Sequence, residues 1–250
     1  MVDMNQIRAF VVESLLPNFN EQWFVHNKTS LLRIRKYCLQ GISLYFMRNL
    51  GKLRTYHFVQ LLTIPERILH VTLGDSLKVK ASKKGLLSRF RRGPTEFLFD
   101  WPSRFDIVDE WLSLLVDQIW PPIDSGLTPE EVLDGIREHI SGGENETVRW
   151  SEGMLTAMCG DLESANRKLH ALEEDLSQWI SASAEKPGVI TDAVVEKLNE
   201  LRKVLQVVTD KERFDQYCQS TAIETTKHLK IPKKYLALKR SEESESRTQN

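Results

Sequence analysis

The sequence contains no long apolar run, and its amino terminus lacks the pattern of a secretory signal. A helix that spans a bilayer needs about 20 predominantly apolar residues, and no stretch of the chain approaches that length without charges. The opening residues, MVDMNQIRAF, carry an acid where a signal would carry basic residues and then an apolar segment. We therefore expect a cytoplasmic protein without a membrane partner.

Cysteine is scarce, and the chain has only Cys38, Cys159 and Cys218. The cysteines are odd in number and widely spaced, and they include no CxxC pair and no Cys/His pair at the spacing of zinc ligands. The histidines never stand three or four residues apart, and HExxH is absent. We therefore predict buried, reduced thiols, and neither a metal ion nor a cofactor.

Motifs that carry catalysis or hold phosphates are also missing. The chain has no GxGxxG and no GxSxG, and Gly51-Lys52 lacks the remainder of a phosphate-binding loop. It also lacks the acid-x-Lys pattern of restriction-type nucleases. We assign no catalytic residue, and the sequence favours a protein that is not an enzyme.

What the chain does have is an uneven distribution of charge. The formal net charge is only −1, but residues 1–104 contain 17 basic and 7 acidic residues, a net charge of +10. Residues 105–250 contain 17 basic and 28 acidic residues, a net charge of −11. Such asymmetry indicates either two surfaces that face each other or two poles that orient partners.

Much of the positive charge lies in the segment KVKASKKGLLSRFRR, residues 78–92, which we predict to be an exposed loop. Clustered Lys and Arg bind phosphates or acidic proteins. The alternative is a solvated loop without a partner, and no interleaved aromatic residues support nucleic acid there. The candidate binding residues of this loop are Lys83, Lys84, Arg89, Arg91 and Arg92.

The amino-terminal half mixes two hydrophobic periods. Residues 4–15 have helical spacing up to Pro17, whereas residues 22–73 form short, β-prone segments separated by turn residues. Helices are expected at 105–119 and, behind the capping box Thr128-Pro129-Glu130-Glu131, at 129–140. These patterns predict an α+β fold with an antiparallel sheet covered by helices; its strands are expected at 23–27, 31–39, 42–48, 55–64, 67–73 and 95–101.

The carboxy-terminal half shows a different pattern. Apolar residues step by three and four from Leu155 to Trp179, and again from Val194 to Val208. We predict a C-terminal antiparallel helical hairpin over 148–218, followed by a partly disordered tail over 219–250. Glu173 and Glu174 are expected on its outer face, as candidate contacts to a basic partner.

The element order and two strings resemble a known family. FLFDWPSRFDIVDEW and PPIDSGLTPEEVLDGI lie within residues 4–140, which resemble a bacterial domain family of unknown function met near toxin-immunity and defence genes. The resemblance implies an α+β domain over residues 1–140 and a place in immunity or defence. That family has no accepted catalytic residues, so the resemblance transfers none.

These observations lead to one functional hypothesis and two alternatives. The hypothesis is a non-catalytic protein-binding module, an immunity or regulatory partner of a bacterial toxin or defence enzyme. The first alternative is a subunit of a nucleic-acid-processing or nucleotide-processing system whose site gathers dispersed residues such as Arg33, Arg35, His57 and Glu66. The second is a scaffold that forms a homodimer through the hairpin.

Overall fold

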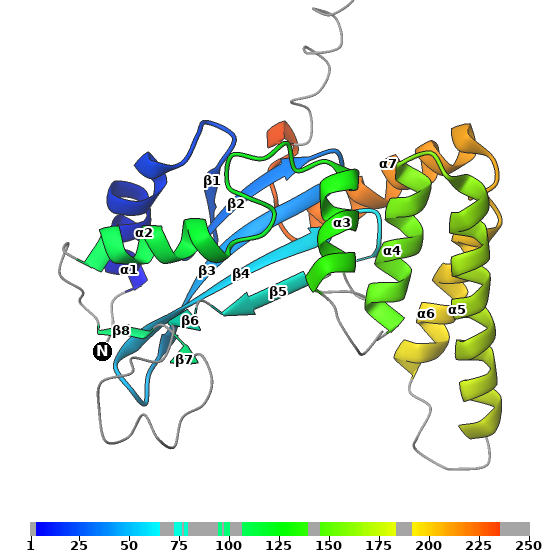
Figure 1. Ribbon diagram of the computed structural model, residues 1–250, viewed down its shortest axis with the longest axis horizontal. Helices are drawn as coiled ribbons and strands as arrows, with labels where there is room; N and C mark the ends of the chain where they lie inside the picture. Colours follow the sequence, from blue (N-terminus) through cyan, green and yellow to red (C-terminus); the bar gives the residue numbers. More distant parts are fainter. Residues whose placement is uncertain are drawn as a thin grey trace, which may run out of the picture. The chain divides into compact units, whose positions relative to one another are not determined.

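A computed structural model describes residues 4–65, 73–76, 78–79, 95–96, 98–100, 107–139, 146–183 and 192–235. The fold is α+β, as the sequence predicts (Figure 1). One antiparallel sheet has the strand order β1-β2-β3-β4-β5, and β8 also pairs with β4. Its strands are β1 (Phe24–His26), β2 (Ser30–Arg35), β3 (Cys38–Met47), β4 (Lys52–Leu61), β5 (Leu73–Ser76) and β8 (Leu98–Asp100); the separate pair is β6 (Lys78–Val79) and β7 (Thr95–Glu96).

The chain forms two compact units, and the first contains most of the sheet. It comprises Met1–Arg33, Gln40–Val59 and Leu73–Ser125. Helix α1 (Met4–Phe10), its continuation through a π-helical turn (Val11–Leu15) and a 3-10 turn (Leu16–Asn18), and helix α2 (Ile107–Gln118) lie against the sheet (Figure 1). The core between them contains Ile7, Val11, Leu15, Trp23, Leu31, Ile42, Leu44, Leu53, Trp111, Leu115 and Ile119.

Strand β4 shows that one face of this sheet is more deeply buried than the other along part of its length. Its residues alternate between buried and half-buried from Lys52 to Val59, which is the two-residue period of a strand with one face in the core. Thr55 points into the core, where its hydroxyl accepts a hydrogen bond of 2.6 Å from the Trp111 indole. The strand predicted at 55–64 is therefore found as part of β4.

The strand predicted over 31–39 is wrong at its middle, because a turn divides it. Lys36 and Tyr37 have φ angles of 44° and 68°, so both adopt the left-handed conformation of a two-residue hairpin turn. Strand β2 consequently ends at Arg35, and β3 begins at Cys38. The strands predicted at 67–73 and 95–101, and the loop over 78–92, fall largely outside the described residues.

A buried arginine ties β2 to the segment that follows α2. Arg33 is 1% exposed. Its Nε donates to Oε1 of Gln40 at 2.6 Å, and its Nη atoms donate to the carbonyl oxygens of Ile123 at 2.5 Å and Pro122 at 2.7 Å. The guanidinium also lies 5.2 Å from the centre of the Trp23 ring. Arg33 therefore satisfies several backbone acceptors at once, as a planar fork of five donors can.

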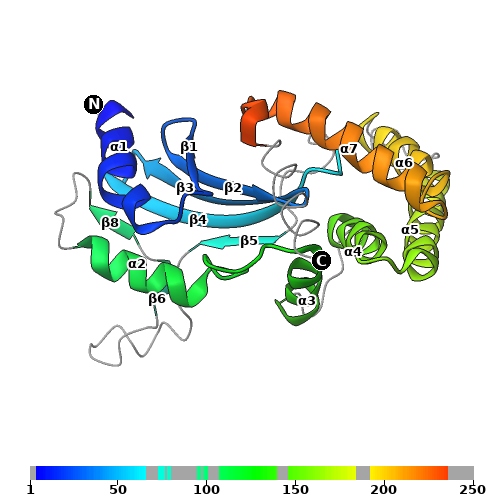
Figure 2. The same cartoon turned by 90° about the horizontal axis from the view of Figure 1, so that it is seen from above.

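The second unit contains the helices after residue 125. It comprises Ile34–Leu39, Gln60–Thr72 and Gly126–Asn250, so α3 belongs to it. The structure groups α3 with the later helices, from Gly126 onward, whereas the sequence predicts a boundary after residue 140. Figure 2 shows its helices from above: α3 (Pro129–His139), α4 (Glu146–Met158), α5 (Leu162–Ser183), α6 (Asp192–Leu205) and α7 (Lys211–His228), followed by a 3-10 turn (Lys233–Tyr235).

The uninterrupted apolar spacing from Leu155 to Trp179 predicts one long helix for the first half of the hairpin, but α4 and α5 are separate helices that pack on each other. Gly160, with φ of 98°, ends α4 in the left-handed conformation. Asp161 then caps α5, because its Oδ1 accepts a hydrogen bond of 3.0 Å from the Ser164 N–H. Gly153 of α4 lies so close to α5 that a Cβ there would be 2.5 Å from Cδ2 of Leu169.

The predicted tail over 219–250 begins too early. Helix α7 continues to His228, and its buried side includes Phe214, Cys218 and Ala222. Thr225 is also buried, and its hydroxyl donates a 3.5 Å hydrogen bond to the carbonyl oxygen of Ile64. The hairpin expected over 148–218 is therefore part of a larger set of helices, while residues 236–250 lie outside the described part of the chain.

Candidate protein-binding groove

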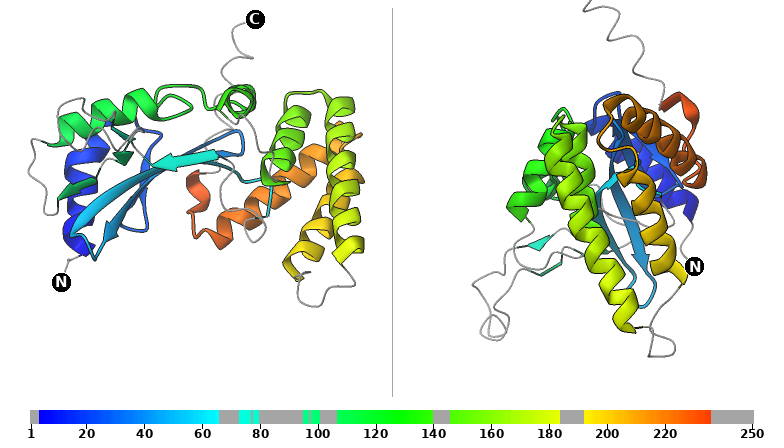
Figure 3. Two further views of the ribbon diagram at one scale, coloured as in Figure 1. Left: turned by 60° about the horizontal axis from the view of Figure 1, so that its bottom comes forward. Right: turned by 90° about the vertical axis from the view of Figure 1, so that its right-hand side faces the viewer.

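Helices α4, α5 and α6 of the second unit enclose a groove, which we call the Trp179 groove. Figure 3, right, shows these helices running beside one another. The groove has a volume of about 360 Å³. Its lining residues are Glu146, Arg149, Leu172, Asp175, Leu176, Trp179 and Val194.

Trp179 is the prominent apolar side chain of this groove. The sequence places it at the end of the apolar seam, where burial is expected, but it is 43% exposed. Leu176 and Leu172, one and two turns earlier on α5, are buried below it. An exposed tryptophan beside a buried apolar floor is the arrangement typical of interface anchors.

Charged pairs surround this apolar centre. Arg149 on α4 and Asp175 on α5 are joined at 2.6 Å, and Lys197 on α6 and Glu146 on α4 at 2.7 Å. Asp175 and Glu146 keep about half of their side-chain surface in solvent, at 58% and 49%. The groove thus has an apolar centre and a polar rim, which is the anatomy of protein interfaces.

The two acidic residues singled out from the sequence have different surroundings. Glu174 is exposed, as expected. Glu173 faces α6, and its Oε1 accepts a hydrogen bond of 2.9 Å from Nε of Arg202 on that helix. The same oxygen accepts a hydrogen bond of 3.2 Å from the hydroxyl of Ser177, one turn later on α5. Its predicted position on the outer face is therefore wrong, because residue 173 adjoins Leu172 at the edge of the packed side. Neither residue lines the Trp179 groove.

Reversing these two charges should have unequal effects on stability. Glu173→Lys places a cation against Arg202 and should lower the free energy of unfolding by about 1 kcal/mol, since the pair is partly exposed. Glu174→Lys, in the adjacent position, should change it by less than about 0.5 kcal/mol. Urea unfolding of the two variants, followed by circular dichroism, measures the difference; equal effects would contradict the pairing of α5 with α6.

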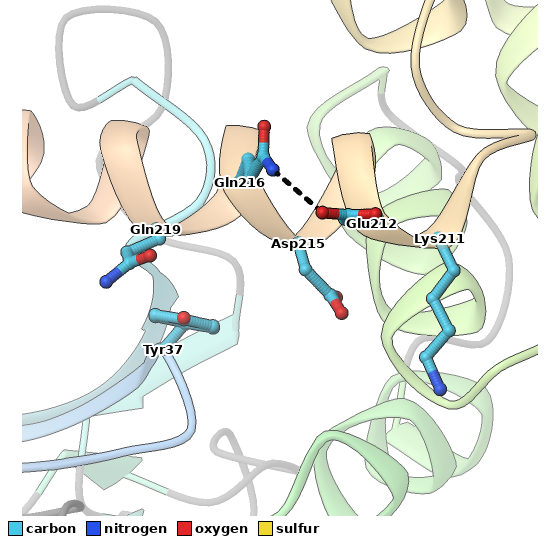
Figure 4. Close-up of a pocket in the computed structure, with 6 residues that line it drawn as sticks. All are labelled: Tyr37, Lys211, Glu212, Asp215, Gln216 and Gln219. Carbon is cyan, nitrogen blue, oxygen red and sulfur yellow. Dashed lines mark hydrogen bonds between the residues drawn. The ribbon is translucent and has the colours of Figure 1, made fainter.

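A second hollow of about 590 Å³ is shallower and polar. Tyr37, from the β2–β3 turn, and five residues of α7 line it (Figure 4). The α7 side chains are exposed, and the one hydrogen bond drawn between lining residues, from Nε2 of Gln216 to Oε1 of Glu212, is 3.5 Å long. Long, exposed polar side chains fix no ligand in place, so this hollow defines no chemistry. The α7 residues are Lys211, Glu212, Asp215, Gln216 and Gln219.

Cys159 is exposed, so the buried thiol predicted for it is wrong, whereas Cys38 and Cys218 are buried as predicted. Cys159 lies beside Glu130 but is not set up as a nucleophile. Burial, and then the neighbouring Glu130 carboxylate, raises the pKa of the Cys159 thiol to about 11. A reactive cysteine has a lowered pKa, because the thiolate is the nucleophile. Burial likewise raises the pKa of Cys218. Among the described residues, no group of three His, Cys, Asp or Glu side chains is placed to hold a metal ion.

The three described residues of the enzymatic alternative, Arg33, Arg35 and His57, have different surroundings. Arg33 donates to carbonyl oxygens and Gln40 inside the first unit. His57, in the same unit, is opposite Asp75 in the register of β4 and β5. Arg35 belongs to the second unit, and Glu66 lies outside the described residues. The five cations of the predicted basic loop, Lys83, Lys84, Arg89, Arg91 and Arg92, also lie outside them.

Comparison with known protein families, with curated proteins and with solved structures finds no match for this chain. The resemblance stated from the sequence therefore remains a prediction. None of the described helices is long and apolar enough to cross a membrane.

Proposed function

We propose that the protein is a non-catalytic binding module whose helical unit holds a partner protein in the Trp179 groove. The observation that carries this proposal is the exposed Trp179 above buried Leu172 and Leu176, within a rim of charged residues. Tryptophan is among the residues that contribute most to binding energy when a partner covers them. The partner therefore presents an apolar side chain at the centre of the contact.

The charge of the helices supports a basic partner. Residues 126–205 contain 16 acidic and 8 basic residues, a net charge of −8. At the rim of the groove Asp175 and Glu146 are paired with Arg149 and Lys197, so the excess negative charge belongs to the rest of this helical segment. A basic partner is steered toward such a surface, which increases the association rate. The segment that fits is an amphipathic helix with one apolar and one cationic face.

The finer role we propose is regulation of a protein that binds nucleic acid. The basic surface of a toxin or defence enzyme that grips phosphates is complementary to an acidic helical unit, and its occlusion would inhibit that protein. An immunity or regulatory partner of this kind needs affinity and shape rather than a catalytic group.

The test compares partner capture by the full-length protein and by its Trp179→Ala variant. Proteins retained from a lysate of the source cell by both baits are quantified by mass spectrometry, and the affinity of the recovered partner is then measured for each. Loss of an interface anchor costs about 2 kcal/mol or more, so we expect roughly 30-fold weaker binding to the variant. Trp179 is already exposed, so its replacement should leave thermal stability nearly unchanged.

Val116→Ala is the matched control, because Val116 is 61% exposed and lies on α2 of the first unit. This variant should retain the partner as wild type does. If Trp179→Ala retains it equally well, the proposal is wrong. Sedimentation of the purified protein addresses the scaffold alternative: a dimer that dissociates on Trp179→Ala would show that the groove holds a second copy of the chain instead of another protein.

A further inference from the structure

The sheet of the first unit has a second face, opposite to the one that α1 and α2 cover. On β3, Leu44 belongs to the helix-covered core, so its neighbour Tyr45 points to the second face. On β4, Leu53 belongs to the same core, so Arg54 and Tyr56 point to the second face. Figure 3, left, brings the lower side of the molecule forward and shows α2 along the upper side of the sheet.

Three aromatic rings lie next to one another on this second face. The centres of the Tyr45 and Tyr56 rings are 6.4 Å apart, with an interplanar angle of 73°. Those of Tyr56 and Phe58 are 6.2 Å apart and nearly parallel, at 23°. Tyr45 is 55% exposed, and the other two rings are half-buried. We call Tyr45, Tyr56 and Phe58 the aromatic face.

The backbone of β3 holds Phe58 in position. A Cβ at Gly41 would lie 2.2 Å from Cζ of Phe58 and 2.8 Å from Cδ2 of Leu32. The Phe58 ring therefore occupies the space that any other residue at position 41 would fill. Because the Phe58 ring is already fixed, little conformational entropy is lost when a planar group stacks on the neighbouring rings of the aromatic face.

Cations accompany the rings on the same strand. Arg54 precedes Tyr56 by two residues and so projects from the same face. Its Nε and Nη2 donate to the Ser76 hydroxyl at 3.0 and 2.7 Å, which fixes the guanidinium beside the tyrosine. Lys52, two residues earlier, is half-exposed on this face.

We propose that the aromatic face binds single-stranded nucleic acid, with bases stacked on Tyr45 and Tyr56 and phosphates near Arg54 and Lys52. Exposed rings on a sheet, flanked by cations, are the arrangement by which proteins bind unpaired nucleotides. The two cations on this face, Arg54 and Lys52, complement phosphates and oppose a basic peptide. The site lies in the first unit and does not depend on the Trp179 groove.

The test uses fluorescein-labelled ten-nucleotide dT and rU strands and the full-length protein, with binding followed by fluorescence polarisation. Wild type should bind with a salt-dependent dissociation constant. Tyr45→Ala should weaken binding by roughly ten-fold, because one stacking platform is lost, while Tyr45→Trp should restore it. Arg54→Met should weaken binding and lower the slope of log K against log salt by about 0.7, the value for one phosphate contact on a single strand.

Two further variants separate stacking from general electrostatic attraction. Asp75 is exposed on β5 and acts electrostatically on Tyr56, so Asp75→Asn should tighten binding a few-fold. Leu50→Ala, at an exposed apolar position in the β3–β4 turn, should bind as wild type does. Circular dichroism verifies that each variant is folded.

The proposal is overturned if wild type does not bind either strand at low salt. It is also overturned if Tyr45→Ala binds as tightly as wild type, because the attraction would then come from charge alone. Polyglutamate, added at the same concentration of negative charge as the labelled strands, serves as a competitor. If it displaces the strands, the ligand of this face is an acidic protein surface instead of a nucleic acid. Loss of partner capture by Trp179→Ala has no bearing on these outcomes.

Discussion

Leu169→Asp should unfold the helical unit at room temperature. Leu169 is 0% exposed on α5 and packs directly over Gly153 of α4. Removal of a buried leucine side chain costs roughly 2–5 kcal/mol, and a carboxylate confined between two helices adds a desolvation cost of several more. The sum approaches the total stability of a typical domain. Urea unfolding followed by circular dichroism at 222 nm measures the loss.

Two variants at the same helix control for this result. Leu169→Met keeps the volume and apolar character of the side chain and should cost about 1 kcal/mol or less. Glu174→Lys, on an exposed position of α5, should leave the unfolding transition in place. If Leu169→Asp unfolds within a few tenths of a molar of the wild-type urea midpoint, the packing of α4 on α5 is wrong.

Arg33→Met should be the most damaging charge removal in the first unit. The guanidinium is 1% exposed and donates to the carbonyl oxygens of Pro122 and Ile123 as well as to Gln40. Methionine fills much of the volume but leaves these acceptors without the donor, at roughly 1–3 kcal/mol for each buried polar group. We expect a loss of about 3–5 kcal/mol, measured by the same denaturation experiment.

Arg33→Lys separates charge from geometry. A lysine keeps the positive charge, but its single ammonium cannot reach acceptors spread around a planar fork, so most of the loss should persist. Arg48→Met, at an exposed position near the end of β3, should change stability by less than about 0.5 kcal/mol. Equal stability of the Arg33 and Arg48 variants would show that the buried network contributes nothing.

Local signals predicted the elements that depend on neighbouring residues. The capping box at the start of α3 is present, because the Thr128 N–H donates to Oε2 of Glu131 at 2.8 Å and the Glu131 N–H to Oγ1 of Thr128 at 3.3 Å. The amphipathic helix near the amino terminus is likewise found as far as Leu15. In both cases the residues that determine the structure lie within one or two turns.

The apolar spacing gave a wrong prediction where a local signal that ends a helix was stronger. Apolar residues step by three and four without interruption from Leu155 across Gly160, so the seam alone predicts one helix. Gly160 followed by Asp161 is nevertheless a helix stop and a helix start. The turn contains few residues, and the apolar pattern resumes in phase on α5. The pair Gly160-Asp161 was therefore the local signal that indicated two helices instead of one.

Other features had no local signal at all. The turn at Lys36 and Tyr37 uses residues that rarely adopt positive φ, so no Gly or Asn marked it. The exposure of Trp179 depends on where α4 and α6 lie beside α5, and the periodicity of α5 does not contain that information. The aromatic face arises because Tyr45 and Tyr56 come from different strands, and only the pairing of those strands brings their rings together.

The discontinuous second unit has a consequence for synthesis on the ribosome. Leu62 and Ile64 are fully buried, and Ile64 accepts its hydrogen bond from Thr225, 161 residues later in the chain. At about 5–20 residues per second, α7 leaves the ribosome on the order of 10 s after this segment. During that interval the nascent chain presents an apolar stretch whose native cover does not yet exist, which is the kind of segment that chaperones recognise.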